Sequence, residues 1–136
     1  MRSRVIISHE DFAKISNCIA ALGIDPRKHF DQLMRKLESA HQRPAHMLPS
    51  DVVTLEATVR VREHDSDDPF SVSVTLPEDM NVEEHRISVL SQVGTALLGE
   101  RVGTTVAWKA PIGTIRADIQ RVAPPHMAAD ALLTAV

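Results

Sequence analysis

The first 43 residues carry apolar side chains at the spacing of an amphipathic helix. Ser8 offers a side-chain oxygen as a helix cap, Asp11 follows three residues later, and Gly23 is the residue type that most often ends a helix. The apolar positions between these signals fall on one stripe: Phe12, Ile15, Ile19 and Leu22. The pattern predicts a first helix that begins after Ser8 and stops at Gly23.

A second helix is predicted directly after the first. Asp25 followed by Pro26 is a strong start signal, because the carboxylate caps free N–H groups and proline fits the first helical turn. The stripe that follows consists of Phe30, Leu33, Met34, Leu37 and His41, before Pro44 forbids further helix. Only two residues separate the helices, so the chain must turn back on itself. Residues 1–47 are therefore predicted to form a short antiparallel helical hairpin with its tip at residues 23–28.

From residue 49 onward apolar positions alternate with polar ones, which is the pattern of half-buried β-strands. The first strand, for example, places Val59 and Val61 on one face and Arg60 and Arg62 on the other. The predicted strands are residues 53–61, 70–76, 105–109 and 114–122, with a polar turn at 63–69. Pro77 ends the second of them.

Residues 87–103 join a strand, a short capped helix and two glycine turns. Ile87 and Val89 alternate with serine as in a strand, and Ser91 is placed to cap the helix that follows. The structural signature of this segment consists of Ser91, Gly94, Leu97, Leu98, Gly99 and Gly103. A strand, the hairpin turn at 111–113 and a last strand then complete the chain.

This segment resembles the C-terminal domain of the bacterial Gre transcript-cleavage factors, and the short N-terminal half is similar to that of the Rnk group, the regulators of nucleoside diphosphate kinase. The resemblance implies an α+β fold in which the hairpin is followed by an FKBP-like, strongly bent antiparallel β-sheet with one short helix. The expected parts are the hairpin at 1–47, the Gre-like β domain at 48–123 and a flexible tail at 124–136. Gln92 stands where Gre domains usually have proline, and Thr104 replaces an aspartate, so the contact surface is expected to differ.

Composition narrows the function classes. The chain has 136 residues, a net charge of −3, one cysteine and no apolar run long enough to cross a membrane, so a cytoplasmic protein without disulfides is expected. Residues 44–123 contain seven basic and twelve acidic residues, which argues against general nucleic-acid binding, and no direct sequence-specific nucleic-acid binding is expected. No metal-ligand spacing, phosphate loop or nucleophile motif occurs, so no catalytic residue, metal or cofactor is predicted.

The resemblance implies a non-enzymatic transcription regulator that binds RNA polymerase near its secondary channel. The expected partner contacts are Asp25, Arg27 and Lys28 at the hairpin tip, with Ser91 and Gln92 at the start of the signature helix. A first helix of about 14 residues is roughly 20 Å long. A hairpin of that length, held out from the sheet, is shorter than the coiled coil with which Gre factors deliver acidic residues to the polymerase. Cleavage stimulation is therefore not expected, and any effect on nucleoside diphosphate kinase is expected to be indirect, through expression.

Two alternatives remain open at this stage. An FKBP-type prolyl isomerase is one, although such enzymes bind proline among several aromatic rings and the β domain has only Phe70 and Trp108. A homodimeric interaction module is the other, because an isolated two-helix hairpin buries little apolar surface on its own. The side chains that would pair in such a dimer are Phe12, Ile19, Phe30 and Leu37.

Overall fold

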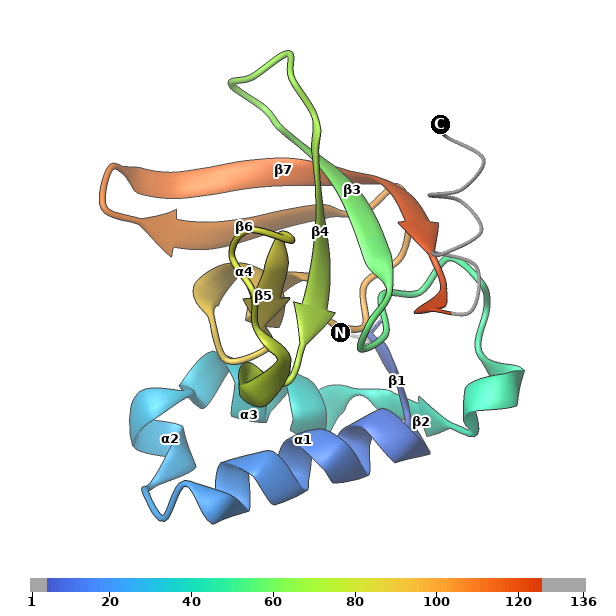
Figure 1. Cartoon of the computed structure of the whole chain (residues 1–136), viewed down its shortest axis with the longest axis vertical. Helices are drawn as coiled ribbons and strands as arrows, with labels where there is room; N and C mark the ends of the chain where they lie inside the picture. Colours follow the sequence, from blue (N-terminus) through green and yellow to red (C-terminus); the bar gives the residue numbers. More distant parts are fainter. Residues whose placement is uncertain (1–4, 126–136) are drawn as a thin grey trace.

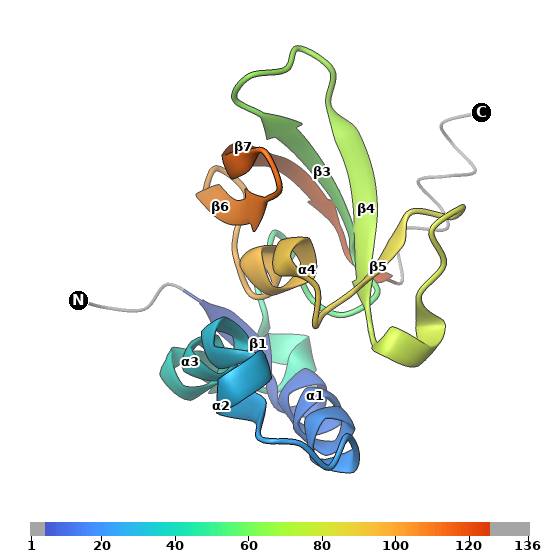
Figure 2. The ribbon, with the colours of Figure 1, turned by 90° about the vertical axis from the view of Figure 1, so that its left-hand side faces the viewer.

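The computed structural model describes residues 5–125 and consists of a curled β-sheet, a short helix held inside its curve, and a helical N-terminal part beneath (Figures 1 and 2). The sheet has five strands in the order β5-β4-β3-β7-β6. An α+β fold is therefore confirmed. Most of the predicted tail, residues 126–136, lies outside the described residues.

The first helix forms as the capping pattern predicts. It follows strand β1 (Ile6–Ser8) and is α1 (His9–Ala21). Ser8 Oγ accepts a hydrogen bond of 2.9 Å from the backbone N–H of Asp11, which satisfies one of the free donors of the first turn. Gly23 has a φ of +65°, the left-handed conformation that ends helices.

The second helix is broken, and the prediction of one continuous helix toward His41 was wrong. Its first turn is α2 (Pro26–His29), capped by Asp25, and its second part is α3 (Asp31–Ser39). Phe30 between them has a φ of −135° and a ψ of +44°, outside the helical region. The break allows both Phe30 and Leu33 to pack against the core.

Residues predicted as the end of that helix instead form strand β2 (His41–Arg43), which pairs in parallel with β1. Ile6 lies opposite His41 in this pair. Two parallel strands need a crossover connection, and α1, α2 and α3 together provide it. A 3-10 turn, η1 (Ala45–Met47), then leads toward the sheet.

The five-stranded sheet is built from β3 (Thr58–Glu63), β4 (Phe70–Thr75), β5 (Arg86–Ser88), β6 (Thr105–Ala110) and β7 (Gly113–Ala123). Three of its four pairings are antiparallel, but β4 and β5 run parallel. The sheet is therefore mixed, and the prediction of a purely antiparallel sheet was wrong. Helix α4 (Gln92–Leu97) lies inside the curve of the sheet, as Figure 2 shows.

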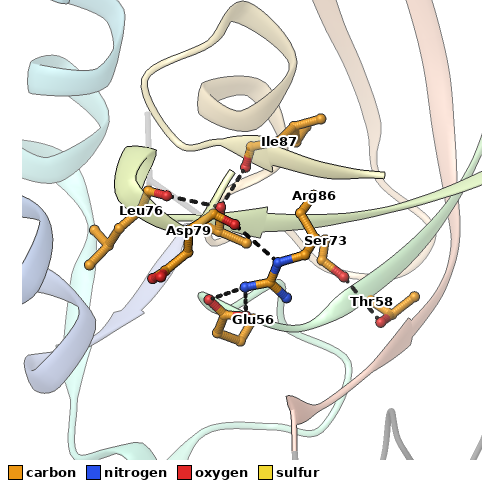
Figure 3. A network of polar contacts seen from close by, with 8 residues as sticks. Glu56, Thr58, Ser73, Leu76, Asp79, Arg86 and Ile87 are labelled. Atoms are coloured by element: carbon orange, nitrogen blue, oxygen red, sulfur yellow. Dashed lines mark hydrogen bonds and ion pairs between the residues drawn. The ribbon is translucent and has the colours of Figure 1, made fainter. Parts of the chain in front are cut away.

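A polar network lies along the connection between β4 and its parallel neighbour β5 (Figure 3). The chain leaves β4 through the 3-10 turn η2 (Pro77–Asp79) and returns at Arg86. The Arg86 guanidinium donates to Glu56 Oε1 at 3.1 Å and to the backbone oxygen of Asp79 at 3.1 Å. Thr75 Oγ1 donates to the backbone oxygen of Leu76 at 3.0 Å. These contacts hold the connection against the sheet.

The first predicted strand is shorter than its alternating pattern suggested. Residues 53–57 alternate in burial, yet the regular ladder begins only at residue 58. Glu56 has a φ of +71°, which interrupts the extended conformation. Val53 pairs outside the sheet: its N–H donates to the carbonyl of Glu100 at 2.9 Å, and its carbonyl accepts from Gly99 at 2.8 Å.

One core joins the N-terminal helices to the β domain, so the hairpin lies against the sheet domain and is not held out from it. The apolar stripe predicted for a dimer is covered by the chain itself: Ile19 and Leu37 are 5% and 3% exposed, and Phe12 and Phe30 pack against the same core. That stripe therefore needs no second copy to cover it. Dimerisation itself stays a prediction.

Both aromatic rings of the β domain also belong to this core. Trp108 is buried and Phe70 packs against the cluster from its edge. A proline-binding pocket needs rings that face an open cavity. The position of these two rings gives the isomerase alternative no support.

Candidate functional site

The hairpin tip carries the first group of predicted contact residues. Asp25, Arg27 and Lys28 are all exposed. Asp25 Oδ1 accepts a hydrogen bond of 3.1 Å from the N–H of Arg27, so this carboxylate acts as the cap of α2. The guanidinium of Arg27 forms an ion pair with Glu38 on α3. Within residues 5–125, Lys28 has no ion-pair partner, which leaves its ammonium group available to a partner.

The start of α4 carries the second group. Ser91 Oγ accepts from the N–H of Gly94 at 3.0 Å and donates to the carbonyl of Ser88 at 2.6 Å. The hydroxyl is therefore engaged as the helix cap, as the sequence predicts. Gln92 is exposed, and its amide is the freer polar group of this pair.

The fold brings these two groups together. A depression of about 250 Å³ lies between the hairpin and α4, and Lys28, Ser91 and Gln92 all line it. Its other walls include His29 and Lys109. We call this depression the tip groove. Asp25 and Arg27 stand outside it, because their side chains are turned toward α2 and Glu38.

The remaining signature residues hold α4 in place. A Cβ atom on Gly94 would lie 2.1 Å from the carbonyl oxygen of Ser88, so only glycine fits there. Gly99 has a φ of +76°, and a side chain on it would meet Val5 and Ile6. Gly103 also has a positive φ. Leu97 and Leu98 are fully buried in the core.

Two side chains fasten the helices to the β domain, and the sequence pattern did not predict either contact. The first is Lys36, whose Nζ donates to the carbonyl oxygens of Ala96 and Leu98 at 3.0 Å each and to Glu100 Oε2 at 2.8 Å. Burial lowers the pKa of Lys36, although the nearby Glu100 carboxylate opposes this. The ammonium group lies at the C-terminal end of α4, where a positive charge is stabilised by the helix dipole. It fastens the hairpin to the β domain.

The second is Asp11, which had been assigned only to the capping pattern. Its Oδ2 accepts a hydrogen bond of 3.0 Å from the N–H of Leu55, across from α1 to the β domain. Burial raises the pKa of Asp11, with the Leu55 hydrogen bond acting in the opposite direction. The side chain lines a larger cavity of about 640 Å³ between α1, the segment at 45–56 and Pro124.

A cluster on the outer face of the sheet has the residue types of a hydrolytic triad but not its arrangement. Asp118 Oδ1 lies 2.9 Å from His64 Nε2 and accepts from Thr105 Oγ1 at 2.6 Å. These two bonds lower the pKa of the exposed Asp118 carboxyl. A triad needs the imidazole between the carboxylate and the hydroxyl. Here the carboxylate stands between the other two, so no imidazole lies beside the hydroxyl to take its proton.

Between residues 5 and 125, histidine, cysteine and acidic side chains form no group of three that could hold a metal ion. No helix in that same range has the length and apolar character needed to span a bilayer.

Known proteins are similar to this chain chiefly in its β-domain part. The family model described as "Transcription elongation factor, GreA/GreB, C-term" matches residues 48–124, more than half of the sequence. The chain belongs to the GreA/GreB family. The resemblance predicted from residues 87–103 is therefore confirmed.

Two relatives are similar to the chain over part of its sequence. "Regulator of nucleoside diphosphate kinase" of Escherichia coli (strain K12) is 32% identical over 61% of this chain and 61% of its own length. "Transcription elongation factor GreA" of Rhodospirillum rubrum is 36% identical over 49% of this chain and 43% of its own length. The matched segment thus spans less than two thirds of either relative. The predicted likeness to the regulators of nucleoside diphosphate kinase is borne out by the first of them.

A solved structure extends the likeness to the N-terminal half. The "Prokaryotic transcription elongation factor GreA/GreB from Nitrosomonas europaea" superposes with a TM-score of 0.74 at 30% identity, covering 90% of this chain and 99% of that one. Gfh1 of Thermus aquaticus matches with a TM-score of 0.51 at 20% identity, which shows a shared fold alone. The arrangement of short helices beside a GreA/GreB sheet therefore recurs in a solved structure.

Proposed function

We propose that the protein is a non-enzymatic transcription regulator that binds RNA polymerase near its secondary channel and does not stimulate transcript cleavage. Family membership supports a role in transcription, since the GreA relatives carry the name of transcription elongation factors. A cytoplasmic location and an indirect effect on nucleoside diphosphate kinase levels, through transcription, are parts of the same proposal.

The observation that carries the proposal is the tip groove. It joins Lys28 of the hairpin with Ser91 and Gln92 of α4 in one concave, mainly polar surface. Residues from two distant parts of the chain thus form one surface with donors from Lys28, Gln92 and Lys109. Such a surface suits the polar or acidic side chains of a protein partner. Asp25 and Arg27 at the rim are included as outer contacts.

The shape of the hairpin supports the absence of cleavage stimulation. Helix α1 has 13 residues and is about 20 Å long. The hairpin lies against α4, and the one carboxylate at its tip, Asp25, caps α2. A second metal ion at a distant reaction centre needs carboxylates that reach it. Here the tip offers neither the reach nor a free pair of acids.

Binding is tested by retention on immobilised core RNA polymerase. Lys28→Glu combined with Gln92→Glu is expected to reduce retention at least tenfold, and Asp25→Ala to reduce it less. The control is Arg43→Glu on β2, which reverses the charge of an exposed residue that does not line the tip groove, as Lys28→Glu does within it. A competing Gre factor is expected to displace the wild type. Retention that ignores both the groove substitutions and the competitor would remove the secondary-channel proposal.

Cleavage is tested separately on backtracked elongation complexes. With a Gre factor as the positive control, we expect the protein to leave the RNA length unchanged and to slow the Gre reaction. Shortening of the RNA by the protein alone would contradict the proposal, even where binding is confirmed.

A further inference from the structure

Four arginines share the outer face of two neighbouring strands, β3 and β7. In β3, Val59 and Val61 point into the core, so Arg60 and Arg62 point outward. In β7, Ala117 and Ile119 are buried, and Arg116 and Arg121 are exposed. Since β3 and β7 pair directly, these side chains form one surface, which we call the arginine face: Arg60, Arg62, Arg116 and Arg121.

The register places one pair of like charges on this face, whereas Arg62 lies opposite Asp118. Arg60 and Arg121 are direct cross-strand partners, next to a register shift in β3. Like charges in that position repel and destabilise a sheet. Within residues 5–125, none of the four guanidinium groups has an ion-pair partner, whereas Arg86 and Arg101 of the same domain pair with Glu56 and Asp51. The Arg60–Arg121 pair therefore does not serve the stability of the sheet, and Arg62 is the one arginine of this face with an acidic cross-strand neighbour.

Its dimensions suit a polyanion. Arg116 and Arg121 are five residues apart on β7, or about 17 Å along an extended strand. Duplex DNA carries roughly one negative charge per 1.7 Å of its axis, so a face of that length meets several phosphates. Asp118, which lies among the arginines, already accepts hydrogen bonds from His64 and Thr105.

The side chains of the arginine face favour duplex over single-stranded nucleic acid. Single strands are held largely by stacking of bases on aromatic side chains. Trp108 and Phe70, the aromatic residues of the β domain, are turned into the core and are not on this face. Guanidinium groups without aromatic neighbours bind the phosphate backbone and do not read base sequence.

We propose that the arginine face binds the phosphate backbone of duplex DNA independently of base sequence. It lies on the side of the sheet opposite the buried side chains that pack against α4, and its four arginines do not line the tip groove. The proposal is thus independent of polymerase binding. The net charge of residues 44–123 does not reveal this face, because twelve acidic residues outnumber seven basic ones there. Four of those seven basic side chains nevertheless lie on one face of the sheet.

The test is fluorescence anisotropy of a labelled duplex with the purified full chain, at several salt concentrations and without polymerase. For the wild type, log K is expected to fall with log salt at a slope of about −0.9 for each phosphate contact. Arg60→Glu combined with Arg121→Glu is expected to weaken binding by more than about tenfold and to reduce the slope by about two contacts. The control, Lys14→Glu with Arg43→Glu, changes the net charge equally at exposed positions elsewhere and is expected to bind within about twofold of wild type.

The single change Arg60→Glu separates binding from folding. It places a carboxylate opposite Arg121, so the midpoint of thermal unfolding is expected to stay or rise while DNA affinity falls. Three results would each overturn the proposal: no binding of the duplex at low salt, an equal loss in the control variant, or tighter binding of the single strand than of the duplex.

Discussion

The contact made by Lys36 gives the sharpest test of how the two parts of the molecule are held together. Its Nζ satisfies two carbonyl oxygens at the end of α4 and the Glu100 carboxylate. The side chains of Lys36 and Glu100 are only 13% and 16% exposed. Removing one partner of a buried pair costs about 3–5 kcal/mol, and the remaining exposure reduces this. We therefore expect Lys36→Met to lower the free energy of unfolding by about 2–3 kcal/mol.

Urea denaturation measures this loss directly. With an m-value of about 2 kcal/mol/M, the midpoint is expected to fall by roughly 1–1.5 M at unchanged m. The neighbouring Arg35→Met is the matched control, because Arg35 is 76% exposed and pairs only with Asp31 one turn away. That pair is worth about 0.3–0.5 kcal/mol. If Lys36→Met costs no more than Arg35→Met, the reasoning fails.

A double-mutant cycle and a titration refine the same prediction. In the Lys36→Met background the Glu100 carboxylate is left without its partner. Glu100→Gln removes that charge, so it is expected to recover part of the lost free energy of unfolding. Burial lowers the pKa of Lys36 below 10.5, so the folded protein releases this proton at a lower pH than the unfolded chain does. The free energy of unfolding should therefore rise with pH in the alkaline window that ends near 10.5, and Lys36→Met should lack that rise. Additive effects in the cycle would show that the two groups are not coupled.

Three further changes probe single residues. Ser91→Ala removes the cap of α4 and is expected to cost about 1 kcal/mol in thermal unfolding; an unchanged midpoint would contradict the capping role. Gly94→Ala forces a Cβ against the backbone of Ser88 and is expected to cost more than about 2 kcal/mol in the same assay, several times the effect of an ordinary surface change. For Asp11, burial raises the pKa above 3.8, so the folded state holds the proton more tightly and the free energy of unfolding falls as pH rises from 3.8 through the raised value. Asp11→Asn should lack this fall while keeping an acceptor for the Leu55 N–H, as denaturation across the acidic range can check.

The sequence was sufficient wherever a structure depends on neighbours in the chain. The cap at Ser8, the restart at Asp25 and the capped helix after Ser91 were predicted correctly, because each depends on a side chain and an N–H two or three residues away. The strands at 70–75 and 105–110 followed from alternation for the same reason.

Errors arose where distant parts of the chain meet. The pairing of β1 with β2 depends on residues 35 positions apart, so nothing near His41 revealed a strand. Strand β5 pairs in parallel with β4, and Arg86 at its start contacts Glu56, 30 residues earlier in the chain. Alternation in a strand is the same for either direction, so the sequence pattern could not show it. The predicted strand at residues 53–61 is interrupted at Glu56, which has a left-handed backbone conformation. A pattern of apolar and polar residues does not reveal such a conformation.

For the candidate site, both groups of contact residues are predictions that rest on a resemblance, and the sequence did not predict their proximity. Lys28 and Gln92 become neighbours of one groove only because the hairpin folds against α4. Lys36, which holds the hairpin there, had no prediction attached to it, since an amphipathic pattern does not tell which polar side chain will be buried. The arginine face likewise depends on the register of β3 with β7.

The central position of β3 also shapes the order in which the molecule can assemble during synthesis. Thr58 pairs with Ala123, so the ladder between β3 and β7 closes only after nearly all of the described chain has been made. Until then β3 is the edge of a three-stranded sheet and presents unpaired N–H and carbonyl groups to other nascent chains. Arg60 and Arg62 lie along that edge, and charge there disfavours pairing between identical copies. A ribosome that stalls before residue 113 therefore leaves an incomplete sheet whose most vulnerable strand is protected by its own positive charge.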